Sequence, residues 1–268
     1  MAVDTALSGR ELLARISEDQ RARRRLFRGK FAVVWLVLIG GLVGLLYATG
    51  NIDPEWYLVW GPYILEGIGT TLIICFSSII FATGLALLGA FGRLSPRPVV
   101  YSVASLYVSL VRGTPLLVQL YFVYYALPEV GLVLPGLVAG IIALSFNYGA
   151  YMTEIFRAGI QAVPQGQREA AEALGMPERL IMRRIVLPQA VRIVIPAIGN
   201  EFVAMIKDSA LVSTISVTEI LWRARRVGTR EFRTLQAMLL AALVYWVLTI
   251  IFSYFQERLE KRMARSDR

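Results

Sequence analysis

The chain has 268 residues, of which 56% are hydrophobic and 18% are charged, and its mean hydropathy is +0.59. It is too apolar for an ordinary soluble domain and too charged for a bundle immersed wholly in lipid. The net charge of +9 fits the Lys and Arg excess of cytoplasmic membrane-protein loops better than it fits nucleic-acid binding. With no histidine and only Cys75, we expect no disulfide framework, no metal site and no Cys–His catalysis.

The N-terminus combines a basic tail with an apolar run. Residues 1–30 are polar and carry six cations between Arg21 and Lys30. The run at 31–50 approaches the roughly 20 residues that cross a bilayer. A cleaved signal peptide is the alternative, but its charged region would be unusually long and no clear small-x-small cleavage site follows. We expect a retained transmembrane helix with a cytoplasmic N-terminus.

Five further apolar runs follow, at about 66–91, 99–126, 136–160, 193–217 and 235–255. Proline and glycine recur between Asn51 and Pro62, which predicts an irregular outer segment there. The run at 99–126 should break at Arg112-Gly113-Thr114-Pro115, because proline removes a backbone hydrogen bond. The sequence therefore predicts an all-α, polytopic membrane protein with six transmembrane helices.

Six spans place both termini in the cytoplasm, together with the basic turn at 92–98, the polar segment at 161–192 and the basic tail at 258–268. One connection disagrees with the positive-inside rule. It faces outward but carries five arginines, Arg223, Arg225, Arg226, Arg230 and Arg233. Either it is an exception or a span is miscounted. Because moving it inside would expose the basic C-terminal tail, we retain six spans.

The polar segment at 161–192 lies between apolar runs and is rich in helix-forming residues. Pro164 suits a first helical turn, residues 165–174 favour a helix, and Gly175 suits a left-handed cap. Pro177 should begin a second helix that ends where Pro188 follows Leu187. The segment should be two short helices joined at a glycine elbow.

One face of the first short helix is small and apolar, formed by Ala170, Ala171 and Leu174. Such a face fits a groove on a protein partner. An amphipathic helix pair lying on the membrane is the alternative, but that use normally requires bulky aromatic side chains opposite the cations.

Glu169-Ala170-Ala171, then Gly175 and Ile185-x-Leu187-Pro188, resembles the EAA loop of ATP-binding-cassette (ABC) importer permeases. Stretches at 111–119, 149–160 and 195–211 resemble the polar amino acid (His/Glu/Gln/Arg/opine) subfamily. The match covers about residues 60–257. It implies a five-helix type I importer core, to which 31–50 adds an extra N-terminal helix.

The resemblance implies that six residues couple the chain to a separate ATPase: Glu169, Ala170, Ala171, Gly175, Leu187 and Pro188. The sequence lacks a G-x-x-x-x-G-K-[ST] phosphate loop. We therefore expect a non-catalytic permease subunit that binds no cofactor, with ATP and Mg used by the partner. A self-sufficient secondary transporter or channel is the alternative, which inverted repeats of broken helices would support.

The implied partners are two ABC ATPase subunits, a second permease copy or paralogue, an extracytoplasmic solute-binding protein, an amino acid and membrane lipid. No nucleic acid is expected. The implied location is the bacterial cytoplasmic (inner) membrane. The sequence leaves open which amino acid is transported and whether the permeases form a homodimer or a heterodimer.

Polar and ionisable groups inside spans usually face a cavity or a partner. An amino acid needs acidic groups or carbonyls for its ammonium, and cations, hydroxyls or helix N-termini for its carboxylate. The candidates for the substrate path are Glu66, Asn147, Tyr148, Tyr151, Glu154, Lys207 and Asp208.

Packing roles remain open for several of these candidates. Asn147 and Tyr148 can instead bond across helices. Glu154 can form a structural ion pair with Arg157 or Arg112. Lys207 and Asp208 project about 100° apart on a helix, so we expect at least one of them to pair with another helix.

Overall fold

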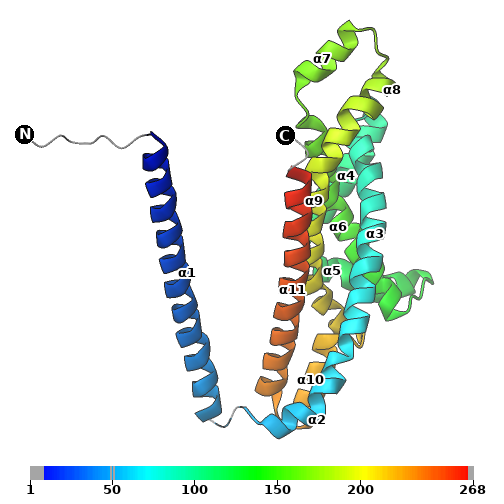
Figure 1. Ribbon diagram of the computed structural model, residues 1–268. Helices are drawn as coiled ribbons and strands as arrows, with labels where there is room; N and C mark the ends of the chain where they lie inside the picture. Colours follow the sequence, from blue (N-terminus) through cyan, green and yellow to red (C-terminus); the bar gives the residue numbers. More distant parts are fainter. Residues whose placement is uncertain (1–8, 49, 51, 265–268) are drawn as a thin grey trace, which may run out of the picture. The chain divides into compact units, whose positions relative to one another are not determined.

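The computed structural model describes residues 9–48, 50 and 52–264. Its ribbon is shown in Figure 1. The chain divides into two compact units, Met1–Glu55 and Trp56–Arg268. Within the described ranges every regular element is a helix, which confirms the all-α prediction.

The first unit contains one long helix, α1 (Gly9–Ala48). Its residues Arg23–Ala48 contain an 18-residue window with a mean hydropathy of 2.4 and are long and apolar enough to cross a membrane. The basic tail expected at 1–30 is therefore helical from Gly9 onward, and residues 1–8 lie outside the described part.

The prediction of an irregular segment between Asn51 and Pro62 holds at residues 52–53 and is wrong from Pro54 onward. Residue 51 lies outside the described part, and helix α2 spans Pro54–Leu65 with Pro62 inside it. Helix α3 (Gly67–Arg93) follows at once, so that Pro54–Arg93 forms one 40-residue candidate span. Proline is tolerated at a first helical turn, and neighbouring helices support it inside an apolar span. Such support depends on tertiary packing, which local sequence does not reveal.

The predicted break at Gly113–Pro115 is confirmed. Helix α4 (Pro98–Arg112) ends there and α5 (Leu116–Tyr121) begins after it. A π-helical turn, η1 (Phe122–Ala126), and a 3-10 helix, η2 (Leu127–Val130), continue the chain. The segments Pro98–Arg112 and Leu116–Val130 are bent by 104° relative to each other. The run expected at 99–126 is therefore sharply bent rather than straight.

Helix α6 (Gly136–Gln161) lies at the centre of the second unit. It packs most extensively against α3, and it also contacts α4, α5 and α9 (Leu187–Asp208). Helix α11 (Thr234–Ala264) packs along α9 and against α10 (Ile220–Arg230). The helix thus includes the expected C-terminal tail as far as Ala264, and residues 265–268 are outside the described part.

The number of spans differs from the six expected. Four helices of the described chain are long and apolar enough to cross a membrane, or five if the bent pair counts as one span. Helix α9 is not among them. The run expected at 193–217 carries Glu201, Lys207 and Asp208, and its α-helical part ends at Asp208. A 3-10 helix, η4 (Ser209–Ile215), continues it. The exact six-helix count is not confirmed.

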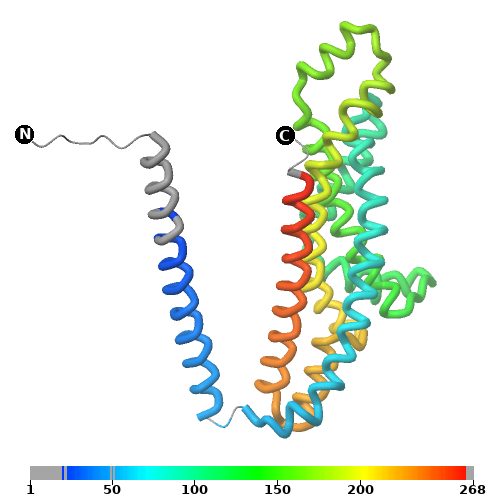
Figure 2. Tube along the Cα trace, viewed as in Figure 1, coloured from blue at the N-terminus to red at the C-terminus, as the bar shows by residue number. Residues whose placement is uncertain are grey.

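The arginine-rich connection after Trp222 is also helical rather than a loop, since α10 covers most of it. Glu219 caps this helix by accepting a hydrogen bond from the Trp222 amide at 2.7 Å. Figure 2 shows the polar segment projecting beyond one end of the second unit, while α2 and α10 meet near the other end. The polar segment and the arginine-rich helix α10 therefore lie at opposite ends of the second unit.

Helix α3 packs so closely against the start of α10 that a single added methyl group should disturb the contact. A Cβ added at Gly67 would lie 2.6 Å from the backbone nitrogen of Ile220, whereas one at Gly69 would meet nothing within 4 Å. We expect Gly67→Ala to lower the free energy of unfolding by about 1–3 kcal/mol relative to Gly69→Ala, because backbone cannot yield as a flexible side chain does. Both variants gain the same helix propensity, so thermal unfolding in nanodiscs isolates the clash. Equal melting temperatures for the two variants would contradict this packing.

Candidate functional site

The polar segment forms the elbow expected from its sequence. Helix α7 (Gln165–Ala173) ends two residues before Gly175, whose φ of 74° is left-handed. The Gly175 amide donates to the Glu172 carbonyl at 2.9 Å, and the Met176 amide donates to the Ala171 carbonyl at 3.1 Å. These bonds satisfy the last carbonyls of the helix. The glycine cap is confirmed.

The second half of the segment does not end at Leu187. Helix α8 (Glu178–Ile181) continues through a π-helical turn, η3 (Met182–Val186), directly into α9, with Pro188 in the first turn of α9. Pro188 has no amide hydrogen to donate, and the π turn takes up the lost bond without ending the helix. The prediction that the helix stops before Pro188 is wrong. The loop is therefore joined rigidly to the membrane bundle through α9.

A small apolar core holds the loop together. Ala171 is only 2% exposed, and it packs with buried side chains from α6, α8, η3 and α9, namely Ile160, Val163, Ile181, Val186 and Ala190. The Gln189 amide also donates to the Gln167 side chain, which ties α9 to α7. The face that the sequence assigned to a partner is thus divided, since Ala171 faces inward.

The outer surface of the loop carries Ala170 and Leu174, and Leu174 is 82% exposed. Beside them is a hollow of about 400 Å³ that Met176, Ile185 and Gln189 also line. A second, more polar hollow of about 700 Å³ is lined by Glu169 and other residues of α6, α7 and α8. An exposed leucine beside one apolar and one acidic hollow is typical of a surface that binds another protein.

The break between α4 and α5 is held by side chains. The Thr114 hydroxyl donates to the Leu110 carbonyl at 2.9 Å, and the Gln119 amide donates to the Val111 carbonyl at 2.7 Å. These bonds satisfy carbonyls that the helix end leaves open. The Asn147 amide donates to the Gln119 side-chain oxygen at 3.2 Å, so α6 is tied to the break. Gln119 was not among the expected site residues, although it ends the motif at 111–119.

A second link joins α6 to the end of α9. The Tyr148 hydroxyl donates to Asp208 Oδ2 at 2.8 Å, and Tyr148 is only 4% exposed. Asp208 and Lys207 are themselves exposed in this chain. Asn147 and Tyr148 are neighbours on α6 and bond to two different partners, Gln119 and Asp208, and we call these four residues the polar cluster.

Glu154 belongs to an ion-pair network instead. It binds Arg93 at 3.1 Å and Arg157 at 2.8 Å. The expected pairing with Arg157 is present, but Arg112 lies over the ring of Tyr151 at 5.1 Å. Arg93, from the end of α3, was not anticipated as a partner. The network fastens α3 to α6 and is structural in this conformation.

Glu66 lies apart from the polar cluster. Its carboxylate binds Arg223 of α10 at 2.7 Å, and the same guanidinium donates to the Tyr63 carbonyl at 3.1 Å. Glu219 was missed by the sequence analysis, although it is fully buried and accepts bonds from the Trp222 amide and the Tyr245 hydroxyl. Only its position before a helix start gave a signal of this capping role.

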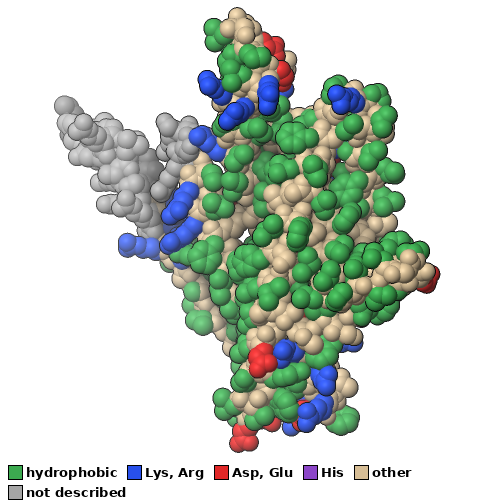
Figure 3. All heavy atoms as spheres, turned by 90° about the vertical axis from the view of Figure 1, so that its right-hand side faces the viewer, with side chains coloured by type: hydrophobic (Ala, Val, Ile, Leu, Met, Phe, Trp, Pro, Cys, Tyr) green, Lys and Arg blue, Asp and Glu red, His purple; other side chains and the backbone are tan. Residues whose placement is uncertain are grey.

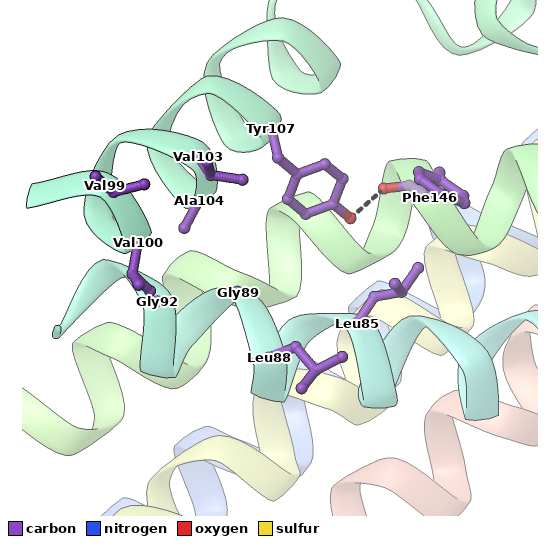
Figure 4. Close-up of a pocket in the computed structure, with 10 residues that line it drawn as sticks. All are labelled: Leu85, Leu88, Gly89, Gly92, Val99, Val100, Val103, Ala104, Tyr107 and Phe146. Atoms are coloured by element: carbon purple, nitrogen blue, oxygen red, sulfur yellow. Dashed lines mark hydrogen bonds between the residues drawn. The ribbon is translucent and has the colours of Figure 1, made fainter. Parts of the chain in front are cut away.

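Figure 4 shows a different hollow, a groove of about 490 Å³ between α3, α4 and α6. Leu88, Val99, Val103 and Phe146 are among its lining residues. Its one side-chain hydroxyl, on Tyr107, already donates to the Phe146 carbonyl at 2.8 Å. The groove offers nothing to bind the charged ends of an amino acid, so it is not the substrate site.

Comparison with known proteins agrees with this architecture. Residues 82–265 match the model of a family described as "Binding-protein-dependent transport system inner membrane component". A solved structure described as an amino acid ABC transporter with histidines is 37% identical, with a TM-score of 0.76 over 79% of this chain and 99% of that one. The inward-facing MetNI methionine ABC transporter, at 16% identity and a TM-score of 0.62, shares the fold.

Relatives in Bacillus subtilis (strain 168) are similar over most of their length. The arginine transport system permease protein ArtQ is 38% identical over 81% of this chain and 100% of its own length. The L-cystine transport system permease protein TcyB is 39% identical over 78% of this chain and 92% of its own length. The chain therefore belongs to the family of binding-protein-dependent transport system inner membrane components, the permeases of ABC transporters.

Proposed function

We propose that this permease imports a polar amino acid, in a complex with two ATPase subunits, a second permease copy or paralogue, and an extracytoplasmic solute-binding protein. The relatives named for arginine and L-cystine transport support the substrate class. ATP and Mg are used by the ATPase, since the chain has no phosphate-binding loop. One observation carries the proposal: a continuous helical path joins the polar loop to the polar cluster.

In this proposal the loop end of the chain lies in the cytoplasm of a bacterium, together with both termini, and the α10 end lies outside the inner membrane. The orientation is supported by cations at the loop end, among them Arg168, Arg183 and Arg184. The ATPase then meets the loop, and the solute-binding protein meets the opposite end.

The loop is suited to transmit ATPase closure. Leu174 and Ala170 are exposed for docking, while Ala171 and the Gln167–Gln189 bond fasten α7 to α9. Helix α9 has 22 residues and therefore extends about 33 Å. At its far end Asp208 binds Tyr148 of α6. A displacement of the loop is thus carried as rigid-body movement to the polar cluster.

The polar cluster can recognise both ends of an amino acid. Asp208 is held through Oδ2, which leaves Oδ1 for an ammonium group. The exposed Lys207 ammonium and the Asn147 amide are donors for a carboxylate, whereas the Gln119 amide group already donates to the Val111 and Thr114 carbonyls. The cluster carries no recognition of a particular side chain, so it suits the common backbone of amino acids.

The elbow gives the first functional test. Gly175→Val should reduce the population of the native elbow about tenfold, because the left-handed conformation costs a branched residue about 1–2 kcal/mol. A Cβ at this position meets nothing within 4 Å, so the cost is conformational and not steric. We expect less uptake per ATP hydrolysed in proteoliposomes that contain the complete complex.

Gly175→Asn is the matched control, since asparagine tolerates the left-handed region. It should retain most of the coupled uptake. If Gly175→Val transports as well as the wild type, with the same ATP consumption, the loop does not transmit closure. Glu169→Gln extends the test to the acidic hollow, and it should weaken coupling without removing the protein from the membrane.

The polar cluster gives the second functional test. Asp208→Asn should raise the KM for uptake about tenfold or more, because a hydrogen bond to a charged group contributes about 1.5–3 kcal/mol. Glu129→Gln, which removes an exposed carboxylate from η2, is the control and should leave KM unchanged. Co-purification of the ATPase reports that both complexes assemble. An unchanged KM for Asp208→Asn would exclude this carboxylate from substrate recognition.

A further inference from the structure

Helix α10 has an arginine-rich face that the transport path does not use. Its apolar face is buried, with Ile220, Ala224 and Val227 at most 2% exposed. Arg225, Arg226 and Arg230 are exposed on the other side, with Arg233 just beyond the helix. Figure 3 shows basic side chains at this end of the molecule, separated from those of the polar loop by a mainly hydrophobic belt.

The turn after α10 presents an aromatic ring to the exterior. Phe232 is 94% exposed, and its φ of 55° is left-handed. The Arg233 amide donates to the Gly228 carbonyl at 2.9 Å, and the Glu231 amide donates to the Val227 carbonyl at 2.9 Å. Helices that end in this way usually place glycine at the left-handed position. A phenylalanine there is strained and buries nothing, which indicates selection for an external contact.

The arginines beside Phe232 are already oriented. Arg226 lies over the ring of Trp222 at 5.0 Å, and Arg230 lies over the ring of Trp60 at 5.3 Å. Stacking fixes the guanidinium plane, while its N–H edge can still donate in pairs to a carboxylate. Arg223 is different, since Glu66 and Tyr63 engage it and it fastens α10 to α2. Arg230 also binds the carboxylate of Glu231 at 3.3 Å. Exposed Arg225 and Arg226 are therefore the guanidinium groups most open to a carboxylate of a partner, and stacking on Trp222 orients Arg226 for it.

We propose that Phe232, Arg225, Arg226 and Arg230 form a docking surface for the solute-binding protein. The matching face of that partner carries carboxylates around an apolar pocket. The inference rests on the proposed function for its orientation, which places α10 outside the membrane and opposite the polar loop. The family is described as binding-protein-dependent, so a soluble partner of this class must meet the outer end of the permease.

This surface accounts for the exception to the positive-inside rule. Arginines on an outer segment oppose the usual charge bias, and their retention needs a function that outweighs it. An aromatic anchor surrounded by arginine is the composition of energetically important protein contacts. Phospholipid phosphates are the competing occupant. They would account for the arginines and for the neighbouring Trp60 and Trp222, but they give no reason for a strained phenylalanine that is 94% exposed.

The test uses the complete transporter in nanodiscs and the purified solute-binding protein that stimulates the ATPase activity of the wild-type complex. Arg225→Glu with Arg226→Glu should weaken binding of that protein about tenfold or more and remove most of its salt dependence. Phe232→Gly should weaken binding by a similar factor while leaving the melting temperature equal or higher, because glycine favours the left-handed turn. The controls are Arg97→Glu, an exposed arginine of the α3–α4 turn, and Val133→Ala, an exposed apolar residue elsewhere.

Wild-type affinity in both sets of variants overturns the docking surface and leaves the proposed function intact. A second outcome also overturns the docking surface. In it the variants bind the solute-binding protein with wild-type affinity but lose ATPase activity, and the loss depends on the fraction of phosphatidylglycerol in the nanodisc. That result would assign the arginines to lipid binding. If no solute-binding protein binds or stimulates even the wild-type complex, the proposed function fails and the docking surface fails with it. Weak binding by Phe232→Gly at unchanged stability supports the proposal most directly, since a structural role cannot produce it.

Discussion

Satisfaction of backbone hydrogen bonds inside an apolar bundle is the constraint on which the rest of this structure depends. Water is absent at membrane depth, so each helix break must be completed by side chains or by a change in helical form. At the α4–α5 break, Thr114 and Gln119 bond the open carbonyls of Leu110 and Val111. Gln119 then accepts from Asn147. Gln119 of the polar cluster therefore satisfies a carbonyl left open by the helix break, and its position follows from the break at Pro115.

The same constraint explains how the loop is joined to the bundle. Pro188 lacks an amide hydrogen, and the π turn at Met182–Val186 accommodates this without ending the helix. The alternative, a flexible connection, would absorb any displacement of α7 before it reached Asp208. Because Ala171 is buried against α6, α8 and α9 residues, the loop also has its own small core. A rigid loop on a continuous helix is what a mechanical coupling element requires.

Local sequence was sufficient where the deciding interaction lies within a few residues. Gly175 at a left-handed cap and the break at Pro115 were predicted correctly, because backbone conformation alone sets both. It was insufficient where distant packing decides. Pro62 and Pro188 are accommodated by neighbouring helices and a π turn, and the pairing of Glu154 with Arg93 joins residues 61 positions apart. The burial of Ala171 likewise depends on where α6 and α9 lie.

The arrangement of ion pairs separates fixed from movable contacts in this conformation. Glu154 binds Arg93 of α3 and so fastens α3 to α6, two helices that already pack extensively, while its second arginine, Arg157, lies on α6 itself. Between α6 and α9 the Tyr148–Asp208 bond is a single hydrogen bond to an exposed carboxylate. A partly buried ion pair between closely packed helices resists displacement more strongly than one hydrogen bond to an exposed carboxylate does. Under the proposed function, α3 and α6 therefore act as the frame, and α9 is the helix that moves when the loop is displaced.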